Sequence, residues 1–462
     1  MYFERIYDED LAQAGYIVGC QQTGEALVVD PLRDVDRYFA VARHQGLTIT
    51  HVTETHIHAD YLSGARELAH AADARLLLSD EGGEDWQYAF AHEGLHHGDR
   101  LTIGKVAIDV VHTPGHTPEH VTFIVTDTAA GDAPTMALTG DFVFVGDVGR
   151  PDLLEKAASI AGTQEAGARQ LYQSLNQIRA LPQYLSIWPG HGAGSACGKS
   201  LGAVPSTTLG YEGATSWAFR APNEDNFVQQ ILEGQPEPPT YFGRMKVQNR
   251  QGPPILGTLP TPERLSPETV EALQREGAQI VDARPKGEYT AGHVPGAINI
   301  QADEGFANWA GWMLDPERPV VFVAPESRID GMVRGLIHVG IDTIAGYLPG
   351  IGPWTESGRS VATLPHIAPQ ELYQRASEFE IIDVRGQDEW DEGHIAGAHH
   401  IHVGHLTRRL EEIPRDRPVA MHCYGGDRST LGASVLKSLG YDNIYNVVGG
   451  LSAWEEQGLP LG

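Results

Sequence analysis

The C-terminal part of this 462-residue chain repeats itself at a spacing of about 100 residues. Residues 280–284 read Ile-Val-Asp-Ala-Arg and return as residues 381–385, which read Ile-Ile-Asp-Val-Arg. The segment 292–297 begins Gly-His and ends Gly-Ala, and it returns in the same form as residues 393–398. The matching Asp, His and Gly residues lie 101 positions apart. A repeat of this length has the size of a domain, so the sequence predicts two homologous domains.

The patterns of apolar residues indicate α/β domains along the whole chain. We place the two repeats at residues 260–360 and 361–462, and near-continuous apolar runs within them suit strands that are buried on both faces. Residues 1–233 alternate short β-like runs with helical patterns, which favours an αβ/βα sandwich of two sheets with outer helices. A Pro-rich run opens the stretch between them, so we expect an irregular linker at residues 234–259.

Composition limits the partners and the compartment. The formal net charge of −28 argues against nucleic acid or an anionic membrane surface as a partner. No run of about 18 apolar residues predicts a membrane span, and the N-terminus lacks the pattern of a secretory signal. The three cysteines (Cys20, Cys197 and Cys423) are too few for a disulfide framework and suit a reducing compartment. We expect a cytoplasmic homo-oligomer, a dimer or a tetramer.

Three polar segments in the N-terminal region each follow a β-like run. The first segment is His56-Ile57-His58-Ala59-Asp60-Tyr61. The second segment contains His116 within Thr-Pro-Gly-His-Thr, and the third segment ends in Gly-Asp at Asp141. Imidazoles and carboxylates delivered by three such segments predict a metal site.

This order of motifs resembles the metal site of the metallo-β-lactamase superfamily. In that superfamily a Gly-His after the last core strand faces the metal, which here implies His191. Most of its hydrolases hold two zinc ions and end the first motif with a further His, where this chain has Tyr61. The set His56, His116 and Asp141 resembles that of the mononuclear iron persulfide dioxygenases. The resemblance implies one Fe(II) per chain, with open coordination positions for substrate and O₂.

The resemblance also implies supporting roles near the metal. His58 would lie beside the metal without binding it, and Asp60 would lie in the same surroundings. Arg150 and Asp152 stand in a Gly-Arg-x-Asp segment similar to one in that family, and Arg150 would bind an anionic substrate or intermediate. The alternative is an ion pair between Arg150 and Asp152 within the loop.

Cys197 follows His191 in a Gly-flanked loop, with Lys199 close in the sequence. A thiol in this position, on the side of the fold that carries the metal, could form a persulfide beside the iron. A structural thiol is the alternative.

The second repeat carries a reactive-looking loop, Cys423-Tyr424-Gly425-Gly426-Asp427-Arg428-Ser429, between a strand-like run and a helical pattern. Its glycines allow backbone amides to turn inward at a helix N-terminus. Together with Arg428 these donors would stabilise a Cys423 thiolate that attacks sulfane sulfur. The loop resembles the rhodanese (sulfurtransferase) motif Cys-x-x-Gly-x-Arg-Ser/Thr, and the Asp-x-Arg repeat resembles the same domain. This resemblance implies that each repeat is a doubly wound parallel sheet with flanking helices. The alternatives are a cysteine phosphatase loop, which usually has two more residues between Cys and Arg, and an inert cysteine.

The first repeat has Ala324 where Cys423 falls, so it cannot carry sulfur covalently. We expect it to act as a spacer, a dimer surface or a docking platform.

The whole chain resembles the bacterial persulfide dioxygenase–sulfurtransferase fusions of sulfide detoxification. The resemblance implies that a persulfide, RSSH, is oxidised with O₂ to sulfite at the iron. Cys423 would then pass sulfane sulfur to sulfite and give thiosulfate. Two alternatives are a zinc-dependent thioester hydrolase similar to glyoxalase II with attached rhodanese modules, and a non-enzymatic sulfur sensor switched by Cys423. Metal content and O₂ uptake distinguish them.

Overall fold

The computed structural model describes residues 1–153 and 162–462, and the chain divides into two compact units. One unit contains Met1–Leu259 with Ile337–Gly340, and the other contains Pro260–Leu336 with Ile341–Gly462. The N-terminal unit therefore includes residues 234–259, the stretch for which the sequence predicts a linker. No helix in the described residues has the length and apolar character that a membrane crossing requires.

The N-terminal unit contains the predicted pair of sheets, each with six strands. In spatial order the first sheet consists of β1 (Tyr2–Asp8), β2 (Gln13–Cys20), β3 (Glu25–Val29), β4 (Thr48–Thr53), β5 (Arg75–Ser79) and β6 (Glu93–Leu95). The second sheet consists of β12 (Thr207–Thr208), β11 (Ser186–Pro189), β10 (Met136–Gly140), β9 (Val121–Asp127), β8 (Val106–His112) and β7 (Arg100–Ile103). Both sheets mix parallel and antiparallel pairs.

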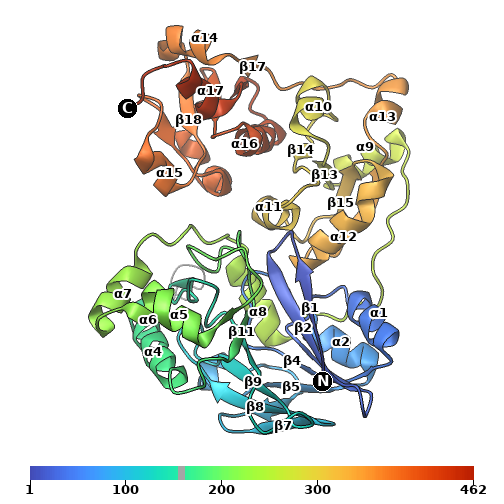
Figure 1. Ribbon diagram of the computed structural model, residues 1–462. Coiled ribbons are helices and arrows are strands. Elements are labelled where there is room, and N and C mark those ends of the chain that lie inside the picture. The colour runs from blue at the N-terminus through green and yellow to red at the C-terminus, as the bar shows by residue number, and fades with distance from the viewer. Residues whose placement is uncertain (154–161) are drawn as a thin grey trace. The chain divides into compact units, whose positions relative to one another are not determined.

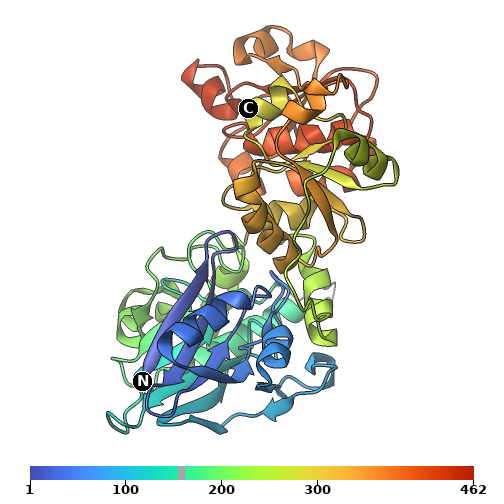
Figure 2. The same ribbon diagram turned by 90° about the vertical axis from the view of Figure 1, so that its right-hand side faces the viewer.

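Apolar side chains on both faces of the strands explain the four layers. Tyr16 and Val18 of β2 pack between the sheets, whereas Ile17 faces outward to the first pair of helices. Likewise Phe123 of β9 lies between the sheets and Ile124 faces the helices on the other side. Figures 1 and 2 show these outer helices. They are α1 (Asp36–Gln45) and α2 (Ala65–Ala72) on the first sheet, and α4 (Thr163–Ile178), α5 (Leu209–Thr215), α6 (Trp217–Arg220) and α7 (Glu224–Leu232) on the second.

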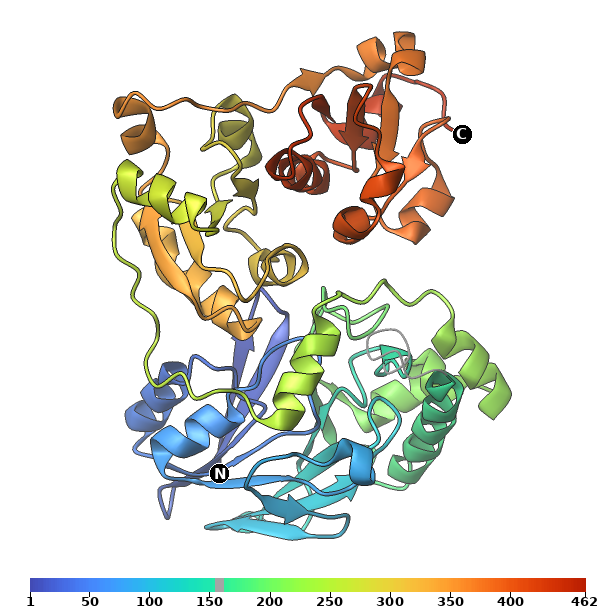
Figure 3. The same ribbon diagram turned by 180° about the vertical axis from the view of Figure 1, so that it is seen from behind.

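The predicted irregular linker contains a ten-residue helix, α8 (Phe242–Gln251), which belongs to the N-terminal unit. Phe242 and Met245 are buried at a three-residue spacing, and Asn249 completes the buried face one turn further on. In Figure 3, α8 is the light-green helix beside the strands of this unit. The sequence did not predict this helix, because it has fewer than three turns and lies between Pro- and Gly-rich segments.

The C-terminal unit contains two parallel sheets, one for each repeat, which confirms the predicted fold. In spatial order the first is β14 (Ile298–Asn299), β13 (Gln279–Asp282), β15 (Val320–Val323) and β16 (Ile344–Leu348). The second is β17 (His366–Ile367), β21 (Ile444–Val447), β20 (Val419–His422), β18 (Glu380–Asp383) and β19 (His399–His400). Helices alternate with the strands, namely α9 (Pro267–Arg275), α10 (Lys286–Ala291), α11 (Phe306–Met313), α12 (Ile329–His338) and α13 (Gly352–Glu356), then α14 (Pro369–Gln374), α15 (Gln387–Glu392), α16 (Asp427–Ser438) and α17 (Gly450–Glu456).

The repeated Asp-x-Arg motif has a structural role in both copies. Arg385 binds the Asp383 carboxylate at 2.7 Å and donates to the Gly393 carbonyl at 2.7 Å. Arg284 makes the same pair of contacts with Asp282 and the Gly292 carbonyl. The buried ion pair fixes the end of a central strand to the Gly-His turn. This explains why the two segments recur together.

Candidate functional site

The predicted metal ligands meet where three strands of the N-terminal unit end. His56 follows β4, His116 follows β8 and Asp141 follows β10. Asp141 Oδ2 lies 3.9 Å from His56 Nε2 and 3.6 Å from His116 Nε2, and all three residues are buried. The predicted triad is thus brought together by loops at one edge of the sandwich.

The triad has the chemistry of a cation site. Within residues 1–153 and 162–462, neither buried carboxylate oxygen of Asp141 has a hydrogen-bond partner. A buried carboxylate left without a partner is costly, and a bound cation removes that cost. Burial raises the pKa of Asp141 to about 6 and lowers the pKa of His116 to about 3. Burial also lowers the pKa of His56 well below its usual value, so both imidazoles are neutral, which is the form that binds metal.

Neighbouring oxygens orient both imidazoles of the triad. His56 Nδ1 lies 2.9 Å from Thr55 Oγ1, and His116 Nδ1 lies 2.9 Å from the Arg150 carbonyl oxygen. The Thr55 hydroxyl in turn donates to Asp30 at 2.9 Å. Because Nδ1 is engaged, each ring turns its Nε2 toward Asp141. Hydrogen-bond partners of metal-binding histidines generally orient the ring in this way.

His58 lies beside the triad and binds elsewhere. Its Nε2 is 3.2 Å from Asp30 Oδ1, and its ring lies 4.2 Å from the His56 ring. Tyr61 stacks on His58 at 4.4 Å and accepts a hydrogen bond from Gln13. This geometry is consistent with a non-ligating His58, and it leaves Tyr61 as a packing residue.

A second set of donor atoms lies next to the first. Asp60, His191 and Cys197 are buried and have their donor atoms within 4.8 Å of one another. His191 Nε2 lies 3.2 Å from Asp60 and 3.5 Å from Asp141 Oδ1. The two oxygens of Asp141 therefore face the two donor sets separately. Burial raises the pKa of the Cys197 thiol, and the Asp60 and Asp141 carboxylates add to that rise.

Arg150 and Lys199 each form hydrogen bonds with neighbouring loops or side chains. Arg150 is fully buried and makes two bonds to Asp152 at 2.7 and 2.8 Å. It also donates to the Ala196 carbonyl. The bonds to Asp152 correspond to the alternative in which the two residues form an ion pair within the loop. The Lys199 amine donates to main-chain carbonyls near the end of α7.

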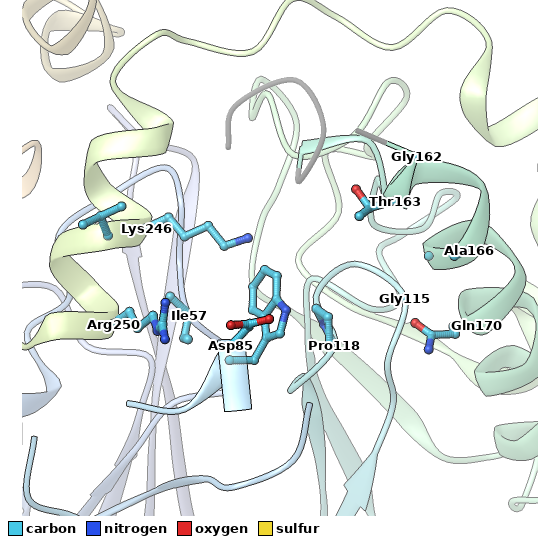
Figure 4. Close-up of a pocket in the computed structure, with 13 residues that line it drawn as sticks. Ile57, Asp85, Gly115, Pro118, Gly162, Thr163, Ala166, Gln170, Lys246 and Arg250 are labelled. Carbon is cyan, nitrogen blue, oxygen red and sulfur yellow. The ribbon is translucent and has the colours of Figure 1, made fainter. Parts of the chain in front are cut away.

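A cavity of about 650 Å³ opens beside the triad. Ile57 and Gly115, which adjoin the ligands His56 and His116, form part of its wall (Figure 4). Lys246 of α8 extends its amine toward the cavity, 3.7 Å from the centre of the Trp86 ring. Burial lowers the pKa of Lys246 to about 7, while the Glu119 carboxylate opposes that shift. This volume is typical of a small-molecule site.

Sequence reasoning missed several residues that support this site. Glu119 accepts from the Ile57 amide at 2.8 Å, and His120 stacks on His56 at 5.1 Å. Asn249 of α8 donates to the carbonyls of His58 and Tyr61. The run Thr-Pro-Glu-His directly after His116 was a signal for the first two. Asn249 had no comparable signal.

Cys423 directly follows β20, and the loop after it turns the Gly426 amide toward its sulfur. The Gly426 amide donates to Cys423 Sγ at 3.0 Å, and the Ser429 hydroxyl does so at 3.6 Å. Gly426 has φ of +102°, a conformation that glycine adopts readily. Of the donors that the sequence predicts around the sulfur, one backbone amide reaches it, and a hydroxyl is added.

The side chains of Arg428 and Tyr424 in this loop differ in their surroundings: one binds a neighbouring helix and the other is exposed. The Arg428 guanidinium binds both oxygens of Glu389 from α15, one of them at 2.8 Å. Tyr424 is exposed on the loop surface. Arg428 therefore contributes charge near the sulfur while its hydrogen bonds go to Glu389. In the first repeat the buried Ala324 occupies the equivalent end of β15.

Two family models match separate parts of the chain. The model of the metallo-beta-lactamase superfamily matches residues 9–191, and that of the rhodanese-like domain matches residues 266–355 and again 368–457. A solved structure described as a metallo-beta-lactamase from Staphylococcus aureus is 41% identical. It covers 75% of this chain and 98% of its own length, with a TM-score of 0.67.

Two kinds of curated protein are similar to the N-terminal region. A hydroxyacylglutathione hydrolase of Rhodospirillum rubrum is 30% identical over 176 residues, which are 38% of this chain and 60% of that protein. A mitochondrial persulfide dioxygenase, ETHE1, of Homo sapiens is 31% identical over 180 residues, with 38% and 62% covered. The chain thus spans about three-fifths of the length of these relatives.

Proposed function

This chain belongs to the proteins that join a metallo-β-lactamase superfamily domain to two rhodanese-like domains, and on that premise we propose that it couples a persulfide dioxygenase to a sulfurtransferase. The observation that carries the proposal is the buried set of two imidazoles and one carboxylate in the same chain as the Cys423 loop. The similarity to persulfide dioxygenases supports it.

The N-terminal unit would convert RSSH, O₂ and H₂O into RSH, sulfite and protons. His56, His116 and Asp141 would hold one Fe(II), which supplies the redox chemistry between the persulfide and O₂. Three protein ligands leave positions for both substrates. Thr55 and the Arg150 carbonyl hold the imidazoles in register while substrates bind.

The cavity beside the triad would take the thiol that carries the persulfide. Trp86 and Ile57 offer apolar surface, and the amine of Lys246 and the guanidinium of Arg250 lie at its wall. These cations would pair with a carboxylate or phosphate of the carrier.

The C-terminal unit would perform the second reaction at Cys423. The thiolate attacks the outer sulfur of RSSH, the S–S bond to the carrier breaks, and the carrier leaves as RSH. The enzyme persulfide then gives its outer sulfur to sulfite, so that thiosulfate forms and the Cys423 thiolate returns. The Gly426 amide and the Ser429 hydroxyl stabilise the sulfur anion in both states.

A second candidate function is thioester hydrolysis at a two-metal zinc centre. The donor set Asp60, His191 and Cys197 favours it, because these residues would hold a second ion next to Asp141. The similarity to hydroxyacylglutathione hydrolases favours it as well.

Metal analysis of the anaerobically purified protein tests the two candidates. One iron per chain with persulfide-dependent O₂ uptake is the expected result. Two zinc ions per chain with thioester turnover and no O₂ uptake would contradict the proposal.

We also propose that the protein is a cytoplasmic homo-oligomer. The three cysteines are all free in the structure, which suits a reducing compartment. Light scattering after gel filtration measures the oligomeric state directly.

A further inference from the structure

The repeat that lacks a cysteine makes direct contact with the loop that carries Cys423. Both repeats belong to one compact unit. Lys286 is the first residue of α10 in the first repeat, and its amine donates to the Gly425 carbonyl at 2.9 Å and to Asp427 Oδ2 at 2.8 Å. Gln301 of the same repeat donates to Asp427 Oδ1 at 3.0 Å. The first repeat thus holds both carboxylate oxygens of Asp427.

Lys286 and Gln301 also bind each other. The Lys286 main-chain amide donates to the Gln301 side-chain oxygen at 2.8 Å. The Gln301 side chain that binds Asp427 is therefore held by the main chain of the residue whose amine binds Gly425. This connection distinguishes them from an isolated surface ion pair, whose contribution is usually small.

The contact with Gly425 determines where the next amide points. The Gly425 carbonyl and the Gly426 N–H belong to one trans peptide group, so they point in opposite directions. Lys286 holds the carbonyl end, and the N–H end donates to Cys423 Sγ at 3.0 Å. A cation on the carbonyl also polarises the peptide and strengthens its N–H as a donor.

Glycine at both positions makes this orientation easy to lose. A peptide between two glycines rotates more freely than one between residues with side chains. A rotated peptide would present its carbonyl oxygen to the sulfur and would repel a thiolate. The second repeat holds the following segment, because the Thr430 hydroxyl donates to the Gly426 carbonyl at 2.7 Å. The Lys286 contact acts one peptide earlier.

We propose that Lys286 is a positioning residue for sulfur transfer at Cys423, and that the cysteine-free repeat is retained because it completes this loop. The proposal rests on the sulfurtransferase half of the proposed function. Equivalent helices of the two repeats divide the task, because α15 supplies Glu389 to Arg428 and α10 supplies Lys286 to the Gly425–Gly426 peptide.

Lys286→Met in the full chain tests the proposal. Transfer of sulfane sulfur to sulfite should fall about 10-fold, and the pH midpoint for alkylation of Cys423 by iodoacetamide should rise by about one unit. Mass spectrometry of the Cys423 peptide reads the alkylation. Lys286→Arg should restore most of both properties, since it keeps the charge and the donors.

A separate control tests whether the loss of one positive charge anywhere in the domain changes the alkylation midpoint. Arg428, Glu389 and Asp383 also act on the electrostatics of this loop. Lys437→Met removes one positive charge from the far end of α16 and should leave the alkylation midpoint unchanged.

Two outcomes would overturn the proposal. One is an alkylation midpoint in Lys286→Met equal to that of the wild type. The other is a lower thermal midpoint with unchanged alkylation and transfer, which would indicate a purely structural contact. Alkylation needs no sulfur substrate, so it still reports on Lys286 should the wild-type chain lack sulfurtransferase activity.

Discussion

Two imidazoles and one carboxylate form the candidate metal centre, and their environment keeps them ready for a cation. Asp141 is the charged member, and neither of its buried oxygens has a geometrically good hydrogen bond among the described residues. His56 and His116 are each held at Nδ1. The free energy of metal binding therefore depends most strongly on Asp141, which neutralises the charge of the ion.

Replacing Asp141 with alanine should abolish metal binding. A ligand that binds only the folded state stabilises it by mass action, and 100-fold excess over Kd corresponds to about 2.7 kcal/mol. Added Fe(II) should therefore raise the thermal midpoint of the wild type and leave that of Asp141→Ala unchanged. Calorimetry under anaerobic conditions measures the shift.

The same variant should lose persulfide-dependent O₂ uptake and keep sulfur transfer at Cys423, which serves as its internal control. An equal shift with Fe(II) in the two proteins would show that the ion binds elsewhere.

Single elements connect the sites to the rest of the fold, and α8 is the example that sequence reasoning missed. Its Asn249 donates to the carbonyls of His58 and Tyr61 and accepts from the Ser63 amide at 2.9 Å. One buried side chain thus fixes three points of the loop that follows His56. The helix has a role in the metal site although none of its residues lies in the donor sets.

Asn249→Ala should lower the thermal midpoint of the N-terminal unit and weaken metal binding. Three buried main-chain groups lose their partner, and a cost of about 3 kcal/mol is expected from such losses. Gln251→Ala, at the exposed end of the same helix, is the matched control. Metal titration of both variants tests the prediction, and equal affinities would contradict it.

The strand β20 introduces a pH dependence into the second repeat. Burial lowers the pKa of His422, at its end, from 6.5 to about 4. The folded-state pKa is the lower one, so the unfolded chain binds more protons between these values. The contribution of neutral His422 to the free energy of unfolding is therefore complete above pH 6.5 and is lost as the pH falls toward 4. For one imidazole this difference amounts to about 3 kcal/mol.

The thermal midpoint of the C-terminal unit should therefore fall more steeply on acidification in the wild type than in His422→Gln. Calorimetry between pH 6.5 and pH 4 compares the two slopes. His366→Gln changes an exposed imidazole and should follow the wild type. Parallel slopes for all three proteins would rule out the linkage.

At the scale of the whole molecule, the sequence predicted features that short motifs encode. The 101-residue repeat predicted two homologous domains, and three polar segments predicted a metal site. The resemblance to known families added the parallel sheets and the triad of His56, His116 and Asp141. The sequence did not predict α8, because the buried face of this helix consists of only two apolar residues and one asparagine. It also did not predict the Lys286 contact, because the partners are 139 residues apart. Long-range polar contacts leave no periodic pattern in a sequence.

Cys423→Ser should change the product of the whole chain without stopping its oxidation. The serine hydroxyl cannot form a persulfide, so sulfite leaves without gaining sulfane sulfur. O₂ uptake with a persulfide should stay within about twofold of the wild type, since Cys423 lies in the other compact unit. Chromatography of derivatised products should show sulfite in place of thiosulfate. Thiosulfate at the wild-type level, after subtraction of the enzyme-free reaction of sulfite with persulfide, would contradict the assignment of Cys423.

Mixing Asp141→Ala with Cys423→Ser then tests whether one chain gains from holding both activities. Each protein supplies the half that the other lacks, so thiosulfate should reappear. In the wild type, sulfite forms in the same chain as the acceptor loop, and such linkage corresponds to an effective concentration on the order of millimolar. In the mixture sulfite must diffuse between molecules. Thiosulfate formed per O₂ consumed should therefore fall on dilution of the mixture and stay constant for the wild type. If both ratios fall in parallel, the fusion gives no kinetic coupling, and the two reactions run independently in one chain.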